Sequence, residues 1–279
     1  MSHPSAAGLR IAFLKMHGAA NDFVVIDHRG IALPEPPDAW IARICDRRRG
    51  VGADGVILLE RDATCDFAMR YFNRDGGAAD FCGNGARCAA RRGLDLGLGS
   101  GGRIRFRTAV GVLDAEPTAG GGIALHFGRV ERAGPEETLQ VEGRTVRGRF
   151  VRAGVPHLVV PVERLSQVPL AEWAPPLRRH PRWGAEGANV DFVERIAPGR
   201  IAMRTYERGV EAETLACGSG AMASALWAAA HGDASPMVVR TWGGDDLEVR
   251  FEPDGEAWDV TLVGPATVAF EGVWTEGGE

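Results

Sequence analysis

The chain of 279 residues is poor in lysine, in long apolar runs and in clustered positive charge. Lys15 is the only lysine among 32 basic residues. An enzyme that binds pyridoxal phosphate needs a lysine to form a Schiff base with that cofactor. Lys15 is therefore the one residue that could carry it.

Other missing features exclude further classes of protein. The net charge is −5 and the run Arg47–Arg49 is only three residues long, so nucleic acid, which needs clustered basic residues, is not an expected partner. No apolar stretch reaches the roughly 20 residues of a membrane helix. The N-terminal residues also lack the charged flank and apolar core of a secretory signal. We therefore expect a cytoplasmic protein without a membrane partner.

The five cysteines are an odd number, which argues against a disulfide framework and for reduced thiols in the cytoplasm. Cys82 and Cys88 do not have the spacing of zinc ligands, and no histidine pair completes a metal site. Cys45, Cys65 and Cys88 are interpreted as small buried hydrophobic residues. The sequence thus predicts no metal and leaves Cys82 and Cys217 for a chemical role.

The two halves of the sequence resemble each other, segment by segment and in the same order. The strand-like segment 66–72 resembles 200–206, and each is followed by a polar loop and a Cys-Gly-x-Gly-Ala motif. These motifs begin at Cys82 and Cys217, and the second loop is one residue longer. Two further pairs keep the same order: 52–57 with 187–192, and 23–25 with 158–160.

This repeat predicts an α/β (α+β) fold of two pseudo-symmetric, duplicated domains, each with mostly antiparallel strands around a central helix. The active site is expected in the cleft between them. We place the N-terminal half at residues 1–130, joined by a C-terminal strand at 265–279, and the C-terminal half at 131–264. The local pattern predicts helices over 38–47, 83–92 and 218–231 and a turn at 174–181.

Each Cys-Gly-x-Gly motif stands where a loop enters an alanine-rich helix. At that point backbone N–H groups lack helical partners and the helix dipole presents partial positive charge. A carboxylate can dock there, and a cysteine in the first turn is expected to have a lowered pKa. Two such starts facing each other would let one thiolate remove an amino acid's α-proton while the other thiol protonates the opposite face. The pattern predicts a cofactor-independent racemase or epimerase.

Two alternatives come from other classes of protein. A cysteine–histidine hydrolase is the other nucleophilic option, but it would leave one of the two cysteines redundant. A non-catalytic binding module that kept the cleft is the alternative outside enzymes. The presence of both cysteines speaks against it.

Five segments resemble the motifs of the diaminopimelate epimerase family, and the resemblance covers essentially the whole chain. It implies an epimerase that interconverts LL- and meso-diaminopimelate without pyridoxal phosphate, in the synthesis of lysine and peptidoglycan precursors. It also implies two pseudo-symmetric α/β domains around a cleft, and a homodimer. The segments are Lys15–Phe23, Phe72–Gly76, Phe81–Cys88, Tyr206–Gly209 and Ala216–Ala221.

The resemblance further implies roles for individual residues. Cys82 and Cys217 would exchange the roles of base and acid with the direction of reaction, and His157 and Glu207 would tune their protonation. Lys15 would belong to a binding loop. Backbone N–H groups of Gly83, Asn84, Gly218 and Ser219 would bind the reacting carboxylate, and polar ends of the substrate would contact Asn21, Asn73, Asn189, Glu207 and Arg208.

Three positions depart from the family pattern. Gly55 stands where many members carry glutamine, Val155 where many carry asparagine, and Ala20 where glycine is common. The first two positions are associated with substrate contacts in the family. They keep open a racemase of the same fold that acts on another amino acid, such as histidine.

Overall fold

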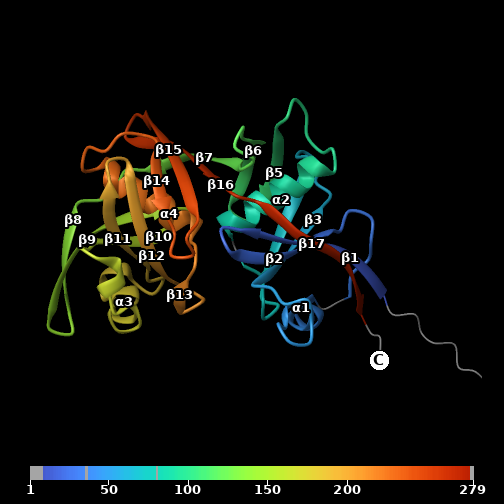
Figure 1. Cartoon of the computed structure of the whole chain (residues 1–279), viewed down its shortest axis with the longest axis horizontal. Coiled ribbons are helices and arrows are strands. Elements are labelled where there is room, and N and C mark those ends of the chain that lie inside the picture. Colours follow the sequence, from blue (N-terminus) through green and yellow to red (C-terminus); the bar gives the residue numbers. More distant parts are fainter. Residues whose placement is uncertain (1–8, 35–36, 80, 277–279) are drawn as a thin grey trace, which may run out of the picture. The chain divides into compact units, whose positions relative to one another are not determined.

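The chain folds into two compact units (Figure 1). Unit 1 combines residues 1–117 with residues 266–279, and unit 2 holds residues 118–265. Within the described part of the chain, every helix is too short or too polar to cross a membrane. The computed structural model describes residues 9–34, 37–79 and 81–276.

Unit 1 is built on a mixed sheet with the strand order β17-β1-β2-β3-β4-β5-β6. The pairs β2–β3 and β4–β5 are parallel, and the other pairs are antiparallel. Parallel neighbours need a crossover, which α1 (Pro37–Cys45) and α2 (Gly83–Asp95) supply. The strands are β1 (Leu9–Gly18), β2 (Asn21–Asp27), β3 (Gly55–Glu60), β4 (Phe67–Asn73), β5 (Ile104–Thr108), β6 (Gly111–Pro117) and β17 (Thr267–Glu276).

Unit 2 has the strand order β8-β9-β10-β11-β12-β14-β15-β16-β7, and β13 also pairs with β12. The pairs β10–β11 and β12–β14 are parallel and are joined through α3 (Leu170–Arg178) and α4 (Gly218–Ala229). The strands are β7 (Ile123–Glu131), β8 (Glu136–Val141), β9 (Arg144–Ala153), β10 (Val155–Pro161), β11 (Asn189–Ala197), β12 (Arg200–Glu207), β13 (Ala212–Thr214), β14 (Met237–Arg240), β15 (Asp246–Asp254) and β16 (Ala257–Gly264).

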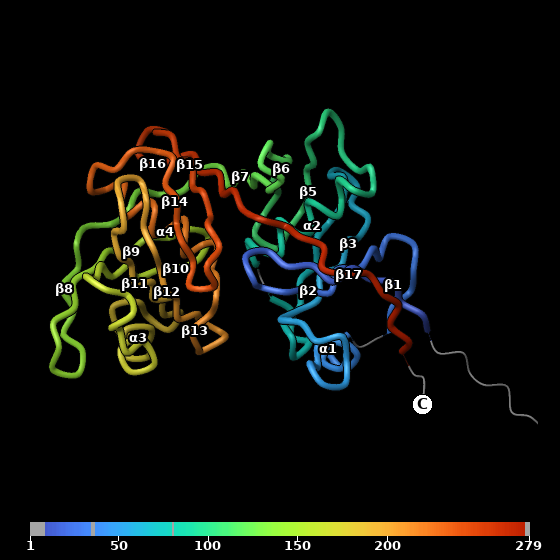
Figure 2. Tube along the Cα trace, in the orientation of Figure 1, coloured from blue at the N-terminus to red at the C-terminus, as the bar shows by residue number. Residues whose placement is uncertain are grey.

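The two sheets repeat one pattern of pairing. Strands β1 to β4 match β9 to β12, and β5 and β6 match β14 and β15. The predicted fold of two duplicated α/β halves is therefore confirmed. Strand β7 follows β6 in the chain but pairs with β16, and β17 pairs with β1 (Figure 2). The expected boundary at residue 130 falls inside β7, and residues 1–8 and 277–279 of the expected halves lie outside the described residues.

The side chains of a strand alternate between the two faces of its sheet. In each unit, helices pack against both faces. In unit 1, Trp40 and Ile41 of α1 are buried in one cluster with Leu58 of β3. On the other face, a Cβ at Gly85 of α2 would lie 3.1 Å from Cδ1 of Ile57. The predicted helices over 38–47, 83–92 and 218–231 are confirmed as α1, α2 and α4.

The expected turn at 174–181 is wrong, because α3 covers most of that segment. Pro175 and Pro176 lie inside this helix and cannot donate backbone hydrogen bonds. Burial of an apolar face offsets this loss. The helix residues on that face, which pack in a cluster with β10, β11 and β12, are Leu170, Ala174 and Leu177.

Candidate active site

Both cysteines of the repeated motif cap the start of a helix. Cys82 precedes α2 with φ −143° and ψ 114°, and Cys217 precedes α4 with φ −123° and ψ 114°. The N–H of Gly85 donates to Cys82 Sγ over 3.5 Å, and the N–H of Gly220 donates to Cys217 Sγ over 3.4 Å. The thiol positions of the two units are thus built in the same way, as the motif predicted.

In unit 1 the Cys82 thiol lies among amide groups. Its S–H donates to Asn21 Oδ1 over 3.4 Å, and the same oxygen accepts from Asn84 Nδ2 over 3.3 Å. Asn84 is buried, and its Oδ1 accepts from the fully buried Arg87 over 2.8 Å. The structure therefore brings Asn21 and Asn84 to Cys82. It adds Arg87, which donates to Asn84 and which no pattern of the sequence selects.

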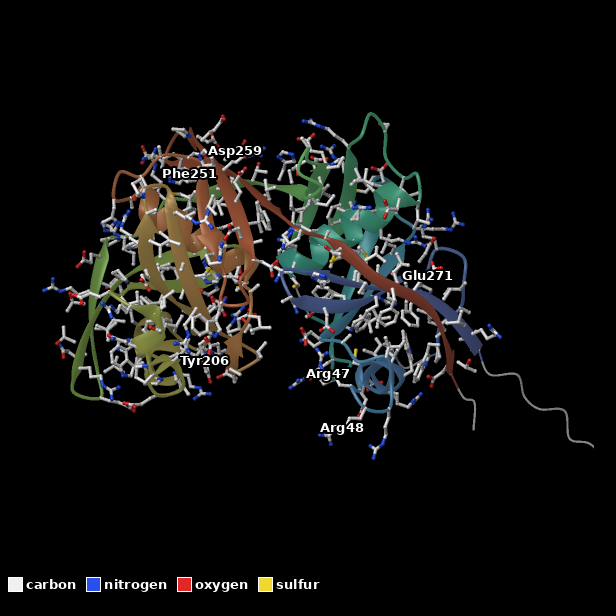
Figure 3. All side chains as sticks on the ribbon, viewed as in Figure 1. Arg47, Arg48, Tyr206, Phe251, Asp259 and Glu271 are labelled. Carbon is white, nitrogen blue, oxygen red and sulfur yellow. The ribbon has the colours of Figure 1, made fainter. Side chains whose placement is uncertain are left out.

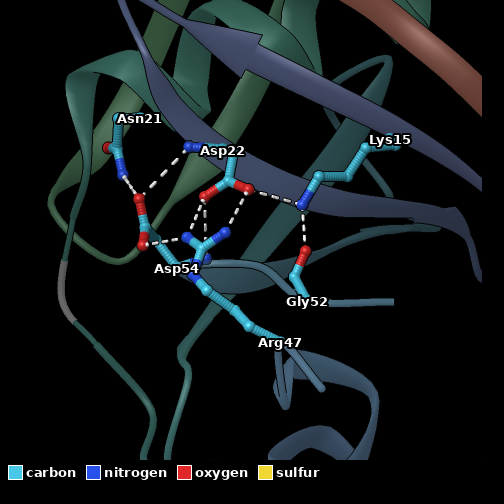
Figure 4. A network of polar contacts seen from close by, with 6 residues as sticks. All are labelled: Lys15, Asn21, Asp22, Arg47, Gly52 and Asp54. Carbon is cyan, nitrogen blue, oxygen red and sulfur yellow. Dashed lines mark hydrogen bonds and ion pairs between the residues drawn. The ribbon is translucent and has the colours of Figure 1, made fainter. Parts of the chain in front are cut away.

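A charged network holds the far side of the Asn21 amide (Figure 4). Asn21 Nδ2 donates to Asp54 Oδ2 over 2.8 Å, and Asp54 Oδ1 accepts from Arg47 over 2.8 Å. Arg47 (Figure 3) also donates to Asp22, and Lys15 Nζ donates to the same carboxylate over 2.6 Å. This network fixes which end of the Asn21 amide faces Cys82.

The carboxylate of Asp22 is the centre of that network. Burial acts to raise the pKa of Asp22, but hydrogen bonds and charge from Arg47 and Lys15 outweigh it and hold the pKa at about 2. Lys15 also donates to the Gly52 carbonyl. Lys15 therefore lies in strand β1 rather than in a loop, and it binds Asp22 of β2 and the loop that precedes β3.

In unit 2 the Cys217 thiol lies beside a carboxyl group. Glu207 shares a hydrogen bond with Cys217 and accepts from Thr214 Oγ1 over 2.5 Å. Ser219 Oγ lies 3.4 Å from Cys217 Sγ. Burial raises the pKa of Glu207 above its usual value. The structure brings Glu207 and Ser219 to the thiol.

The expected lowering of the cysteine pKa is wrong for Cys217. Burial raises its pKa well above the usual value, and the negative charges of Glu207 and Asp191 add to that effect. Hydrogen bonds from Ser219 and Gly220 act in the opposite direction but are outweighed. The Cys217 side chain is therefore a thiol in this environment.

Beneath the start of α4 lies a buried polar cluster centred on Asp191. Its Oδ2 lies 2.6 Å from His157 Nδ1, and its Oδ1 accepts from Thr205 Oγ1 over 2.7 Å. His157 and Asp191 have no exposed side-chain surface. A Cβ at Gly220 would lie 2.5 Å from Asp191 Oδ1, so this glycine lets the helix start approach the carboxylate. Asp191 was not among the predicted site residues, although its carboxylate stands within an apolar strand segment of the sequence.

Asn189 connects this cluster to Arg208. Its Nδ2 donates to His157 Nε2 over 3.3 Å, and its Oδ1 accepts from the Arg208 N–H over 2.7 Å. The Arg208 guanidinium binds Glu186 over 3.0 Å at the surface. Hydrogen bonds therefore divide the predicted residues of unit 2 into two groups, one with His157, Asn189 and Arg208 and the other with Cys217, Glu207 and Ser219.

Asn73 and the three other cysteines differ in their exposure to solvent. Asn73 is exposed and lies opposite Gly55 across the pair β3–β4. Cys45 and Cys88 are buried as predicted, and burial raises the pKa of each to about 12. Cys65 is only half-buried, because it lies in a turn beside Arg107.

The chain is similar in sequence to known epimerases. A family model described as diaminopimelate epimerase matches residues 13–133 and 149–269. The diaminopimelate epimerase of Aquifex aeolicus is 39% identical over 276 residues, which cover 95% of this chain and 98% of that protein. The diaminopimelate epimerase of Gemmatimonas aurantiaca is 39% identical over 275 residues, which cover 94% of this chain and 98% of that protein.

Solved structures extend the likeness to the fold. A hydroxyproline epimerase from Agrobacterium vitis matches with a TM-score of 0.72, covering 97% of this chain and 93% of that chain. Only 17% of its residues are identical, so this match concerns the fold alone. The sequence matches are far closer and span nearly the full length of both proteins. Thus the chain belongs to the diaminopimelate epimerase family.

Proposed function

We propose that this protein interconverts LL- and meso-diaminopimelate without pyridoxal phosphate. The observation that carries the proposal is the pair of cysteine N-caps, Cys82 and Cys217, at corresponding helices of the two halves. It is joined by the chain's membership of the family and by its similarity to two curated diaminopimelate epimerases.

In the proposed mechanism the two cysteines serve opposite faces of one α-carbon. One thiolate takes the α-proton, so the Cα–H bond breaks and an S–H bond forms. The electron pair left on carbon spreads into the adjacent carboxylate. The other thiol then gives its proton to the opposite face of the carbon, and its S–H bond breaks. The configuration inverts and no cofactor is consumed.

Backbone donors at the two helix starts stabilise the charge that develops on the carboxylate. Such donors are already oriented before the reaction begins, and they lie in the partial positive field of the helix dipole. The sequence places small residues there, so a ligand can approach the backbone closely. The residues assigned to this role are Gly83, Asn84, Gly218 and Ser219.

The groups beside each thiol set its proton affinity. Glu207 has a raised pKa and a hydrogen bond with Cys217, so it is suited to accept the thiol proton when Cys217 acts as the base. His157 acts indirectly, because Asp191 and Asn189 hold its two ring nitrogens. Asn21 accepts the S–H of Cys82 and is assigned the corresponding orienting role.

The polar residues near each of the two cysteines would hold the other groups of the substrate. Arg208 can pair with a carboxylate through two parallel hydrogen bonds. Its present partner, Glu186, is a surface carboxylate, and such pairs contribute little energy, so a substrate carboxylate could replace it. Asn21, Asn73, Asn189 and Glu207 complete the assigned set.

The biological setting follows from this activity. The reaction would supply precursors of lysine and peptidoglycan, in the cytoplasm, with a small amino acid as the partner rather than nucleic acid or a membrane. We also propose a homodimer. Strand β17 offers an apolar surface for a second copy, because Val268 and Val273 lie on one face of the strand and are 40% and 49% exposed. The molar mass in solution, measured by light scattering, tests this assignment.

The experiment is an incubation of reduced protein with LL-diaminopimelate in D₂O without added cofactor. Chiral chromatography and mass spectrometry should show the meso isomer with deuterium at the inverted carbon. Cys82→Ala and Cys217→Ala should each abolish inversion, whereas Cys65→Ala serves as a matched control that keeps it. No inversion by folded, reduced wild-type protein would contradict the proposal.

Gly55 and Val155 favour one second candidate, a racemase of another amino acid such as histidine. Both positions lack the polar side chain that is common in the family. A panel of amino acids under the same conditions separates the candidates. Faster turnover of histidine than of diaminopimelate would favour the second one.

A further inference from the structure

Three residues of unit 1 share one face of the sheet near the start of α2. Gly55 pairs with Asn73 across β3–β4, and Ile57 pairs with Tyr71. Since side chains alternate along a strand, Gly55, Tyr71 and Asn73 lie on the same face. That face is covered by α2, since Ile57 contacts the first turn of this helix at Gly85. Tyr71 thus lies on the sheet face that is covered by α2, the helix that Cys82 caps.

The Tyr71 ring fills the space in which a side chain at position 55 would begin. A Cβ at Gly55 would lie 2.6 Å from Tyr71 Cε2 and 3.1 Å from the Tyr71 hydroxyl. It would also lie 2.3 Å from the Phe72 carbonyl oxygen. These distances are too short for any side chain, so position 55 has to be glycine. The hydroxyl end of Tyr71 stands over it.

Unit 2 has a polar group at the matching place. Asn189 begins β11 as Gly55 begins β3, and it pairs with His157 as Gly55 pairs with Phe23. The strands thus match one residue earlier in unit 2 than the sequence repeat of 52–57 with 187–192 predicts. The Asn189 amide binds the backbone N–H of Arg208, next to Glu207. Each unit therefore carries a neutral polar group at the start of this strand, β3 in unit 1 and β11 in unit 2. In unit 2 the strand residue itself supplies the group, and in unit 1 the neighbouring strand supplies it through Tyr71.

We propose that the Tyr71 hydroxyl determines specificity by contacting the polar end of the substrate that is remote from the reacting carbon. This inference rests on the proposed function. The reacting carboxylate is assigned to N–H groups of the helix starts, whereas Tyr71 projects from the sheet beside Asn73. A phenol hydroxyl can donate to a carboxylate or accept from an ammonium group.

The surroundings hold the Tyr71 ring in place for this contact. Phe23 packs edge-to-face against it, with ring centroids 5.9 Å apart and an interplanar angle of 80°. Gly55 lies against the hydroxyl end, and the side chain is half-buried. A ring held in this way loses little conformational entropy when a ligand binds, which favours a binding role.

The test is Tyr71→Phe, which removes the hydroxyl and keeps the ring. We expect the KM for diaminopimelate to rise about tenfold, as for the loss of one hydrogen bond to a charged group, with kcat changed less than about twofold. Thr108→Val is the matched control, because it removes a hydroxyl that donates to the Gly111 carbonyl elsewhere in unit 1. Its KM should stay at the wild-type value.

Two results would overturn the inference. One is an unchanged KM in Tyr71→Phe. The other is a fall in kcat with an unchanged KM, which would place Tyr71 at the chemical step. If the wild type turns over diaminopimelate and Tyr71→Phe matches it, only the role of Tyr71 is wrong. If the wild type fails to do so, the proposed function is wrong.

Discussion

The two cysteines share one backbone setting, but different strand residues lie beneath their helix starts. In unit 2 these residues are polar and buried, and one of them is a carboxylate. In unit 1 the corresponding residues are largely apolar. The register of the strands matches His157, Asp191 and Thr205 of unit 2 with Phe23, Ile57 and Tyr71 of unit 1.

This difference separates two properties that a duplicated site might have kept together. The repeated helix start places a thiol and backbone donors in the same way in both halves. The residues beneath and beside it then decide how tightly the thiol holds its proton. Cys217 faces Glu207 and Asp191, which raise its pKa, whereas Cys82 faces the amide oxygen of Asn21. We infer that the two thiols are chemically unequal in the absence of substrate.

The largest effect is expected when the polar residues beneath α4 are replaced by apolar ones like those beneath α2. Asp191→Leu leaves the buried His157 and Thr205 side chains without their carboxylate partner. We expect the free energy of unfolding to fall by about 2–6 kcal/mol, because two buried groups each lose a hydrogen-bond partner at about 1–3 kcal/mol. Urea denaturation measures this change.

A second variant tests the physical reason for that loss. Replacing a whole buried polar group of residues by apolar ones can be nearly neutral. Adding His157→Phe to Asp191→Leu should therefore recover part of the stability. If the double variant loses the sum of the two single losses, the residues do not act as one cluster.

The local pattern of the sequence predicts the helix starts and the repeat, but not which strand residues lie beneath each helix start. The Cys-Gly-x-Gly motif is a short segment whose own residues form the cap. Asp191 meets His157 and Thr205 from 34 and 14 positions away, so only the folded sheet brings them together. The raised pKa of Cys217 has the same origin, because burial by distant segments outweighs the helix start. The contact between Tyr71 and Gly55 likewise depends on strand register.

A smaller effect is expected in unit 1 from Asp54→Ala. Asp54 accepts from Nδ2 of Asn21, so without it the amide can turn and present its NH₂ group to Cys82. We expect kcat to fall about tenfold, within the range of a lost hydrogen bond at a reacting group. Asp46→Ala is the control, because the Asp46 carboxylate accepts backbone bonds from Arg48 and Arg49 in the same loop. Equal kcat values for the two variants would show that the network does not orient Asn21.

The charge of Glu207 should affect how Cys217 responds to pH. Glu207→Gln removes a negative charge beside Cys217, so the pKa of Cys217 should fall. Alkylation of Cys217 by iodoacetamide, followed by peptide mass spectrometry in a Cys82→Ala background, should then begin at lower pH. An unchanged pH profile would mean that the charge of Glu207 does not contribute to the pKa of this thiol.

The stability of the same variant gives an independent check. The pKa of Glu207 is raised in the folded protein, so the folded state favours its protonated form. The stability from this group is present below the usual pKa of 4.5 and is lost as the pH rises through the raised pKa. Relative to Glu207→Gln, the wild type should therefore become less stable over that interval in urea titrations.

The smallest effect concerns the turns that precede β2 and β10. Unit 1 uses Ala19 and Ala20 at φ +55° and +63°, whereas unit 2 uses Gly154 at φ +80°. A left-handed conformation costs an ordinary residue roughly 1 kcal/mol. Ala20→Gly should stabilise the protein by up to that amount, and Gly154→Ala should destabilise it. Thermal unfolding measures both changes, and shifts in the same direction would contradict this account of the turns.

The central claim is that Cys82 and Cys217 act as two bases on opposite faces of one carbon. The most direct test is α-proton exchange in D₂O by Cys82→Ala and Cys217→Ala, each with LL- and with meso-diaminopimelate. Each variant should exchange the α-proton of only one isomer, without inversion, and the two variants should select opposite isomers. Exchange of the same isomer by both variants, or inversion by either of them, would contradict the two-base mechanism.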